Sequence, residues 1–380
     1  PIIASLALML LLASYLALFP ALAMLLAKRF NKYFSTFSFV LAWVISEWLR
    51  SWLLTGFPWL SIGYTQLTSP LAEFAPVIGE FGLQVIVLFI CISFLNKQKF
   101  VPFLTCIFIF NIAWALTLLD WTVPNPTSNE PKKITVGLVQ GNIEQSIKWQ
   151  PDNEVPTMLK YAQLTQPLWG NADLIVWPEA AIPRLEVLSS EFLKEMDRTA
   201  ADHNAALLTG IVDFQPNTEF AFNNIIALGK KSSTDQFGHY QYLDNNRYSK
   251  HHLLPIGEFV PFESILRKLA PIFDLPMSSF SRGDYQQKNI EANSIKIAPA
   301  ICFEIAFSNQ VRDNLNPDSD FILTVSNDAW FGNSHGPWQH LQIAQMRALE
   351  FAKPVIRVTN NGITAIIDKK GDIQAQLPQN

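Results

Sequence analysis

The sequence predicts a transmembrane α-helical segment followed by an α/β domain, and two observations support this. Charge is distributed unevenly: residues 1–120 hold six Lys or Arg and four Asp or Glu, whereas the other 260 residues hold 22 and 28. In addition, strand-like and helix-like segments alternate after residue 133. Only 16% of the 380 residues are charged, against about a quarter in most soluble proteins. The composition therefore predicts one part in a membrane and one part in water.

The charge pattern predicts three parts along the chain. Residues 1–120 form the membrane segment, residues 121–133 form a linker with three prolines, and residues 134–380 form the α/β domain. Because the chain begins with Pro1 rather than Met, we expect it to be truncated at its N-terminus. A net charge of −4 does not favour nucleic-acid binding, which usually leaves a basic footprint. Three cysteines exclude a disulfide framework.

Four apolar stretches in residues 1–120 are candidates for membrane spans, since a bilayer core takes about 20 apolar residues. They are Ile2–Ala27, Phe37–Leu54, Val77–Leu95 and Phe100–Leu119. Any one of them is equally consistent with a buried core helix, but four in succession favour membrane helices. Glu47 and Arg50 lie three residues apart in the second stretch, so a helix would pair them. That pair is either structural or functional.

The loops between these stretches predict their orientation. Lys28, Arg29 and Lys32 follow the first stretch, and two further lysines separate the third from the fourth, whereas residues 51–79 contain no Lys or Arg. Basic loops face the cytoplasm. We therefore expect a multi-pass protein of the bacterial inner membrane whose α/β domain lies on the periplasmic side.

The second part alternates strand and helix candidates, which is typical of an α/β fold. Several strand candidates are continuous apolar runs, as in sheets buried on both faces. The expected strands are Ile134–Gln140, Asp173–Trp177, Ala206–Thr209, Ile225–Leu228, Ile295–Ile301, Phe321–Ser326 and Val355–Thr359. The expected helices are Glu154–Leu168, Leu188–His203 and Trp338–Ala352.

No cofactor or metal is expected. The sequence has neither a G-x-G-x-x-G nor a Walker A motif, so nucleotide binding has no support. Its six histidines and three cysteines do not show the spacing of a zinc site.

Four residues of the α/β domain are candidates for chemistry. Cys302 is the only cysteine after residue 120 and follows an apolar strand, where α/β folds place reactive groups. Glu179 follows another apolar strand in the order Trp-Pro-Glu, and Lys250 precedes Glu258 by eight residues. Each signal alone is weak, because a buried inert cysteine or a surface lysine explains it equally well.

Taken in order, the motifs W-P-E, K-x7-E and C-x-E resemble the nitrilase superfamily, whose members carry a Glu-Lys-Cys triad on a four-layer α-β-β-α sandwich. Four segments are more specifically similar to the apolipoprotein N-acyltransferases, the membrane-bound bacterial branch: Gly141–Trp149, Tyr248–Glu263, Cys302–Glu304 and Ser326–Gly332. Glu47–Trp59 in the membrane segment resembles that family too.

This resemblance implies an acyltransferase that works through a thioester. Cys302 would attack the acyl ester of a phospholipid, with phosphatidylethanolamine as the expected donor, while Glu179 takes the thiol proton and Lys250 stabilises the oxyanion. The N-terminal α-amine of a diacylglyceryl apolipoprotein would then take the acyl group. The resemblance implies that this transfer would be the last step of bacterial lipoprotein maturation.

The resemblance also implies supporting roles. Glu258 would support Lys250, Glu304 would shape the mouth of the pocket, and Trp149 and Trp330 would line the substrate site. Residues 266–280 are unusually apolar for a loop and are either a lid or membrane-dipping arm or an ordinary packed connection.

Two other functions are weighed against acyl transfer. The triad alone is equally compatible with a membrane-tethered amidase of the nitrilase type, in which water resolves the acyl-enzyme. A non-catalytic membrane scaffold would have no need for Glu179, Lys250 and Cys302.

Overall fold

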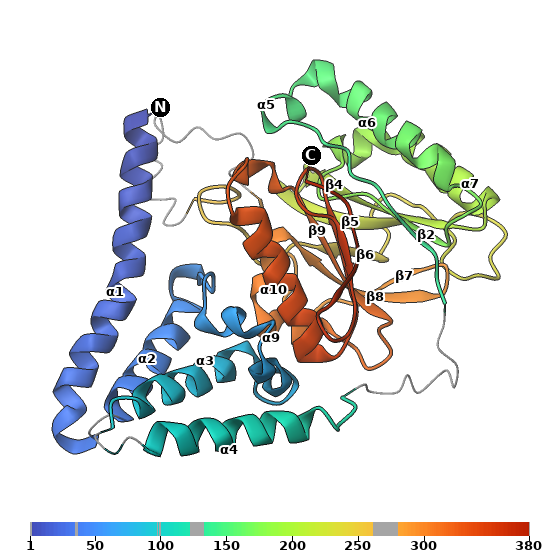
Figure 1. Ribbon diagram of the computed structural model, residues 1–380. Helices are drawn as coiled ribbons and strands as arrows, with labels where there is room; N and C mark the ends of the chain where they lie inside the picture. The colour runs from blue at the N-terminus through green and yellow to red at the C-terminus, as the bar shows by residue number, and fades with distance from the viewer. Residues whose placement is uncertain are drawn as a thin grey trace. The chain divides into compact units, whose positions relative to one another are not determined.

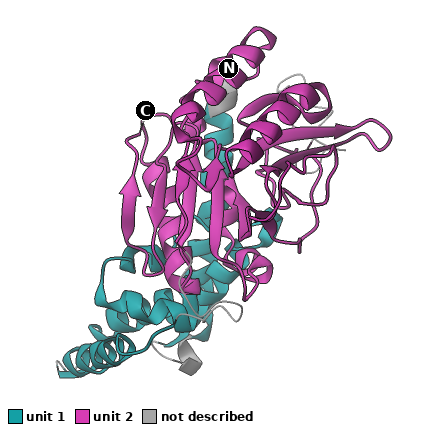
Figure 2. Cartoon of the chain, turned by 90° about the vertical axis from the view of Figure 1, so that its right-hand side faces the viewer, with its two compact units in different colours: residues 1–121, 262–274 teal, residues 122–261, 275–380 magenta. Residues whose placement is uncertain are grey.

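The computed structural model describes residues 2–34, 37–96, 98, 100–121, 133–260 and 280–379. They divide into two compact units, coloured separately in Figure 2. The described part of unit 1 runs to Trp121, and that of unit 2 begins at residue 133. Most of the predicted linker 121–133, and the predicted lid 266–280 except Phe280, lie outside the described residues.

Unit 1 is helical, and each of the four apolar stretches contains a helix (Figure 1). The helices are α1 (Ile2–Phe34), α2 (Phe37–Arg50), α3 (Ala75–Ser93) and α4 (Phe100–Leu116). Within the described residues, two segments, Leu6–Phe30 and Pro70–Ser93, are long and apolar enough to cross a membrane. Of the four predicted spans, α2 has 14 residues and α4 has 17, so these two fall short of the expected length.

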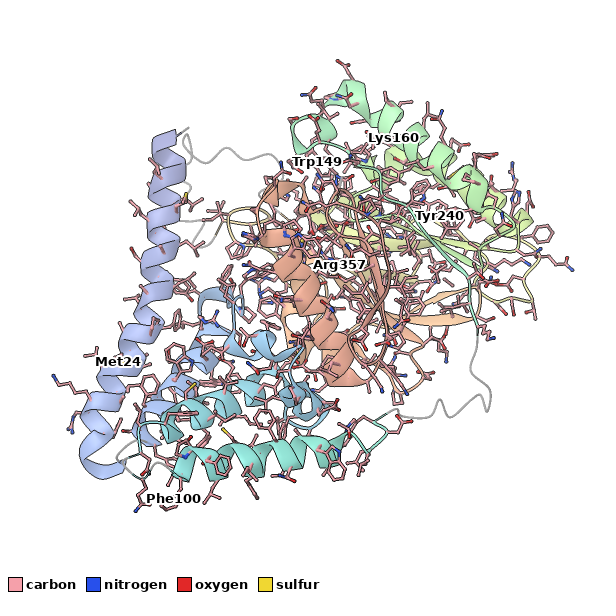
Figure 3. The ribbon with its side chains drawn as sticks, viewed as in Figure 1. Met24, Phe100, Trp149, Lys160, Tyr240 and Arg357 are labelled. Atoms are coloured by element: carbon pink, nitrogen blue, oxygen red, sulfur yellow. The ribbon has the colours of Figure 1, made fainter. Side chains whose placement is uncertain are left out.

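Apolar side chains on the helices of unit 1 are exposed, which agrees in part with the predicted membrane spans. Met24 on α1 and Phe100 on α4, both labelled in Figure 3, are each 59% exposed.

Glu47 and Arg50 form the ion pair that the sequence predicts, and Arg50 also donates from Nη1 to the carbonyl oxygens of Phe57 and Trp59, at 2.5 and 2.7 Å. These bonds hold the chain that leaves α2 and favour a structural role for the pair.

Unit 2 contains two six-stranded sheets. In the first, the strand order is β1-β2-β4-β5-β6, with β3 paired to β4. β1, β2 and β4 are parallel, and β5 and β6 continue antiparallel. The bounds are β1 Val136–Leu138, β2 Leu174–Val176, β3 Ile182–Leu185, β4 Ala206–Gln215, β5 Phe220–Gly229 and β6 Arg247–Ser249.

The second sheet has the order β12-β11-β10-β9-β8-β7, with β8, β9 and β10 parallel. Its bounds are β7 Ile290–Ala292, β8 Ile295–Ile301, β9 Phe321–Ser326, β10 Val355–Thr359, β11 Ala365–Ile367 and β12 Ile373–Gln376. The predicted ranges of β8, β9 and β10 are confirmed to the residue. The short strands β3, β6, β7, β11 and β12 were not predicted.

The predicted helices of unit 2 are also confirmed, with ends shifted by a few residues. They are α6 (Pro151–Thr165), α7 (Ser190–Asp202) and α10 (Gly336–Phe351). Two short helices were not predicted, α5 (Gln145–Lys148) and α9 (Ser308–Asn314).

Two apolar clusters hold the first sheet from both faces. Along β2 and just after it, Ile175 and Trp177 join one cluster with residues of α6 and α7, whereas Leu174 and Val176 join another with residues of β8 and β9. Alternate side chains of a strand point to opposite faces. One face of the first sheet is therefore covered by α6 and α7, and the other packs on the second sheet. Each fully buried Leu, Ile or Val contributes about 1.5–3 kcal/mol.

Candidate active site

Glu179 lies just beyond the carboxyl end of β2, after the buried Trp177 and Pro178. The turn that carries it presses against Gly210 of β4: a Cβ at Gly210 would lie 2.6 Å from the carbonyl oxygen of Pro178 and 2.7 Å from the Cα of Glu179. Any larger residue at position 210 would collide with the backbone of the turn that carries Glu179, so glycine is required there.

The Glu179 carboxylate is buried and receives donors on both oxygens. Oε1 accepts from Asn223 Nδ2 at 2.8 Å and from Lys250 Nζ at 3.2 Å, and Oε2 accepts from the backbone N–H of Asn327 at 2.9 Å. Burial alone would raise the pKa of Glu179, but Lys250 and Lys148 outweigh it and lower that pKa below its ordinary value. Glu179 is therefore an ionised carboxylate near neutral pH.

Lys250 follows β6 directly and is 1% exposed. Its Nζ lies 2.8 Å from Oε1 of Glu258 as well as 3.2 Å from Glu179. Burial opposes the charge, yet the two carboxylates raise the pKa of Lys250 well above its ordinary value. The segment thus provides a fixed cation between two carboxylates.

Cys302 begins the short turn Cys302–Ala306 at the carboxyl end of β8, with φ of +54°. Burial and the nearby Glu179 raise the pKa of Cys302, whereas Lys250 lowers it. The resting side chain is therefore a thiol, so attack on a substrate needs a base. The three predicted residues Glu179, Lys250 and Cys302 are thus brought into electrostatic range of one another.

Glu304 does not lie at the mouth of a pocket, and that expectation is wrong. Its side chain is fully buried and accepts from the backbone N–H groups of Ile301 and His251, at 2.7 and 2.8 Å, from Tyr248 Oη at 3.0 Å and from Gln310 Nε2 at 2.7 Å. Burial raises the pKa of Glu304, while the backbone donors oppose that rise. Glu304 instead ties the turn that carries Cys302 to the segment that carries Lys250.

A cavity of about 480 Å³ opens at this site. Glu179, Glu258 and Asn223 line it, together with Trp149 and Trp330, the two tryptophans that the resemblance places at the substrate site. Trp330 is 65% exposed, so it offers a large apolar surface at the opening. Phe280, the one described residue of the predicted lid, also lines the cavity.

Lys148 and Asn223 also belong to this candidate site, and neither was predicted from the sequence. Lys148 ends α5 beside Trp149 and is 2% exposed, with Nζ donating to the backbone carbonyl of Glu179 at 3.1 Å. Burial lowers the pKa of Lys148 to about 8, although Glu179 and Cys302 favour its charged form. Lys148 lies within the similar segment 141–149, which was the available signal; nothing in the sequence singled out Asn223.

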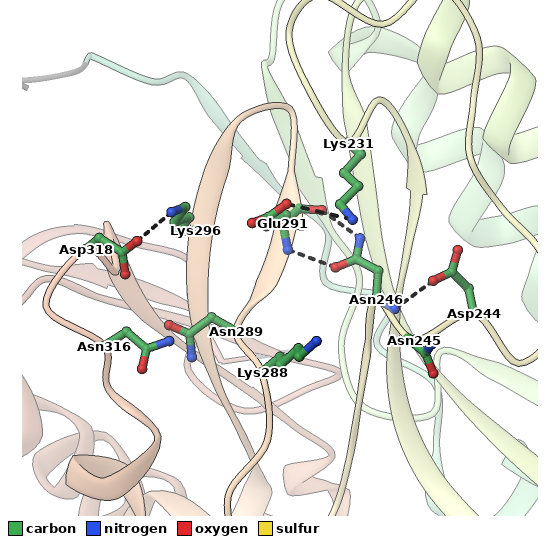
Figure 4. A pocket seen from close by; sticks show the side chains of 10 residues that line it. All are labelled: Lys231, Asp244, Asn245, Asn246, Lys288, Asn289, Glu291, Lys296, Asn316 and Asp318. Carbon is green, nitrogen blue, oxygen red and sulfur yellow. Dashed lines mark hydrogen bonds and ion pairs between the residues drawn. The ribbon is translucent and has the colours of Figure 1, made fainter. Parts of the chain in front are cut away.

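A second cavity, of about 350 Å³, lies elsewhere in unit 2 (Figure 4). Its cations are largely neutralised: Lys296 lies 2.5 Å from Asp318, and Lys231 lies 3.8 Å from Glu291. None of its ten lining residues is a cysteine or a histidine. Across the described ranges, no cluster of three or more His, Cys, Asp or Glu residues could hold a metal ion. The cavity beside Glu179 is therefore the better candidate for chemistry.

Comparison with known proteins places the two parts in known families. Residues 135–380 match the family model described as carbon-nitrogen hydrolase, and residues 1–93 match the apolipoprotein N-acyltransferase N-terminal domain. A Photobacterium profundum protein named apolipoprotein N-acyltransferase is 50% identical over 335 residues, 87% of this chain and 63% of that protein. A Shewanella oneidensis protein of the same name is 45% identical over 390 residues, 100% of this chain and 74% of that protein.

The chain thus spans less than two thirds of the Photobacterium relative. Among solved structures, a CN-hydrolase superfamily protein from Xanthomonas campestris is 20% identical, with a TM-score of 0.44 over 66% of this chain and 88% of that one.

Proposed function

The chain belongs to the carbon-nitrogen hydrolase family and, within it, to the apolipoprotein N-acyltransferases, and we propose that it moves a fatty acyl chain from a phospholipid to the N-terminal α-amine of diacylglyceryl apolipoproteins. One observation carries the proposal: buried Glu179 and Lys250 form an ion pair, with 3.2 Å between Oε1 and Nζ, and both lie within electrostatic range of the Cys302 thiol. A base, a cation and a nucleophile are the parts that acyl transfer needs.

In the first half-reaction Glu179 takes the proton from Sγ of Cys302, and the sulfur attacks the carbonyl carbon of the phospholipid ester. Lys250 stabilises the negative oxygen that forms. The carbon–oxygen bond then breaks, and the protonated Glu179 gives its proton to the departing lysophospholipid. The acyl group remains on Cys302 as a thioester.

In the second half-reaction the neutral α-amine of the lipoprotein attacks the thioester, and Glu179 takes the amine proton. The carbon–sulfur bond breaks, the sulfur recovers its proton, and an amide is formed. Amide formation from a thioester is downhill, so no nucleotide is consumed. Glu258 keeps the charge and position of Lys250 through both steps, since it lies 2.8 Å from Nζ.

The proposed function also implies where the two units lie in the cell. We propose that unit 1 anchors the protein in the bacterial inner membrane through several spans, that unit 2 lies on the periplasmic side of that membrane, and that α9 and α10 form the fourth layer of an α-β-β-α sandwich. The candidate spans Leu6–Phe30 and Pro70–Ser93 support this. Extracting an acyl chain into water costs roughly 0.8 kcal/mol per CH₂, so a site at the bilayer avoids a large cost. Trp149 and Trp330 line the acyl or amine site, and phosphatidylethanolamine is the proposed donor.

The test uses phosphatidylethanolamine with a labelled acyl chain. We expect a hydroxylamine-sensitive adduct on Cys302 that disappears rapidly when a diacylglyceryl-cysteine peptide is added, with label appearing on the peptide. An adduct that decays equally fast without peptide would support a membrane-tethered amidase or hydrolase instead. The absence of any adduct would contradict both enzymatic functions.

A further inference from the structure

The backbone of Cys302 is held in an unusual conformation by a side chain far along the sequence. Its φ of +54° lies in the left-handed region, which costs a non-glycine residue of order 1–3 kcal/mol and persists only when its surroundings enforce it. The carbonyl oxygen of Cys302 lies 3.1 Å from Nε2 of His340, which is 1% exposed on α10. Because a carbonyl can only accept, Nε2 is the donor in this bond.

His340 is itself fixed by the segment after β9. Its Nδ1 lies 3.1 Å from Oδ1 of Asp328, and the same oxygen accepts from Ser326 Oγ at 2.6 Å. Oδ2 of Asp328 accepts a hydrogen bond from Nη2 of Arg357, a residue of β10, at 2.5 Å. Although burial opposes it, Arg357 and His340 hold the pKa of Asp328 well below its usual range.

The ring of His340 therefore lies between two acceptors, the carboxylate of Asp328 and the carbonyl of Cys302. Only the doubly protonated ring satisfies both, and Asp328 favours that form. Burial and Arg357 oppose it and lower the pKa of His340. The bond to Cys302 needs the proton on Nε2, and in the doubly protonated ring Asp328 accepts from Nδ1 and fixes the orientation of the ring.

We propose that His340 is a positioning residue for acyl transfer: it holds the carbonyl of Cys302, and thereby the left-handed turn that presents the thiol to Glu179 and the substrate, with Asp328 and Arg357 acting through it. This inference rests on the proposed function only for the reaction that it serves. The positioning itself is a property of the Cys302 thiol and is measurable without any lipid.

A purely structural polar core is the competing explanation for this network. It would predict that substitutions of His340 change stability alone. The network differs from such a core because it ends on the backbone of the proposed nucleophile, through a single bond from one ring nitrogen. Substitutions that keep or lose that one nitrogen therefore separate the two explanations.

The experiment measures alkylation of Cys302 by iodoacetamide in the full chain, with Cys91→Ser and Cys106→Ser so that one thiol reports. In His340→Gln the amide nitrogen occupies the place of Nε2, whereas in His340→Asn it occupies the place of Nδ1. We expect the Gln variant to react within about threefold of the parent rate and the Asn variant to change by tenfold or more. His335→Gln, an exposed site before α10, is the matched control and should not change.

Acyl-adduct formation on phosphatidylethanolamine is then compared in the same variants. His340→Asn should lower the maximal rate of adduct formation at least tenfold with little change in the lipid concentration at half-maximal rate, and His340→Gln should restore most of it. Equal alkylation rates in the Gln and Asn variants, with melting temperatures near that of the parent, would overturn the positioning role. A parent chain that alkylates normally but never forms an adduct would contradict the proposed function and leave the alkylation comparison valid.

Discussion

Lys250 and Glu258 form the shorter of the two ion pairs that hold the buried ammonium, with 2.8 Å between Nζ and Oε1. The pair with Glu179 measures 3.2 Å. The proposed base therefore does not have to neutralise Lys250 alone, because Glu258 carries part of that task. Glu179 then remains able to accept a proton while the cation stays charged.

The substitution Glu258→Gln tests whether Glu258 shares with Glu179 the neutralisation of the Lys250 charge. The amide keeps a similar shape but removes one negative charge. Lys250 would then interact more strongly with Glu179 and make Glu179 a weaker base. We expect adduct formation on Cys302 to slow by 10- to 1,000-fold, a range typical for loss of an electrostatic contribution at a reacting centre. Glu191→Gln, with a side chain 90% exposed, should leave the rate unchanged. Unaltered kinetics in the Glu258 variant would remove it from the mechanism.

The pH dependence of adduct formation should reflect the lowered pKa of Glu179. Lys250 and Lys148 lower this pKa below 4.5, so the carboxylate stays ionised as the pH falls from 7 towards 5. The acid limb of the rate should therefore have its midpoint below pH 4.5, measured by single-turnover labelling. Glu179→Gln should abolish the adduct. A midpoint near pH 6 in the parent would contradict this assignment of the base.

Lys148→Met should raise the thermal stability of the protein. The folded-state pKa of about 8 lies below the usual 10.5, so folding penalises the charged form of Lys148. The penalty is fully present below pH 8 and is relieved as the pH rises from 8 towards 10.5, since the unfolded chain then still binds the proton. We expect Lys148→Met to raise Tm by a few degrees at pH 7 and by less at pH 9.5.

The matched control for that substitution is Lys160→Met, at an exposed lysine of α6 that is labelled in Figure 3. Its Tm difference from the parent should be small and the same at both pH values. A Lys148→Met protein that is less stable than the parent at pH 7 would show that the bond to the Glu179 carbonyl outweighs the burial cost.

Trp330→Ala should weaken lipid binding more than chemistry. Trp330 lines the cavity yet is 65% exposed, so it contributes apolar surface for a substrate and holds little of the fold together. We expect the KM for phosphatidylethanolamine to rise several-fold with kcat nearly unchanged. Trp338→Ala, at a tryptophan that is 49% exposed and outside this cavity, is the control. An equal effect of both substitutions would argue against a specific lipid contact.

Sequence patterns predicted the long buried strands because their signal is local. Ile295–Ile301 and Phe321–Ser326 are continuous apolar runs, and the structure reproduces both ranges. Strands such as β6 and β7 have three residues each and include polar residues, so they form no continuous apolar run that could be recognised.

The site was predicted less completely because its contacts are not local. Asn223 reaches Glu179 across 44 residues, and His340 reaches Cys302 across 38. Glu304 was misplaced for the same reason: a carboxylate after a strand resembles a pocket residue, and only the donors that the fold gathers around it show otherwise. Motif similarity indicated Glu179, Lys250 and Cys302, the proposed reacting residues, whereas the residues that support them depend on which strands become neighbours.

The buried carboxylate of Glu304 makes two distant stretches of the chain depend on one another. It accepts hydrogen bonds from the backbone N–H of Ile301, one residue before the proposed nucleophile Cys302, and from the backbone N–H of His251, one residue after Lys250. Neither stretch can shift without losing bonds to the same group. We therefore expect substitutions around Tyr248 to alter the reactivity of Cys302 even though they do not contact it. On heating, the reactivity of Cys302 and the folded structure should be lost together rather than one after the other.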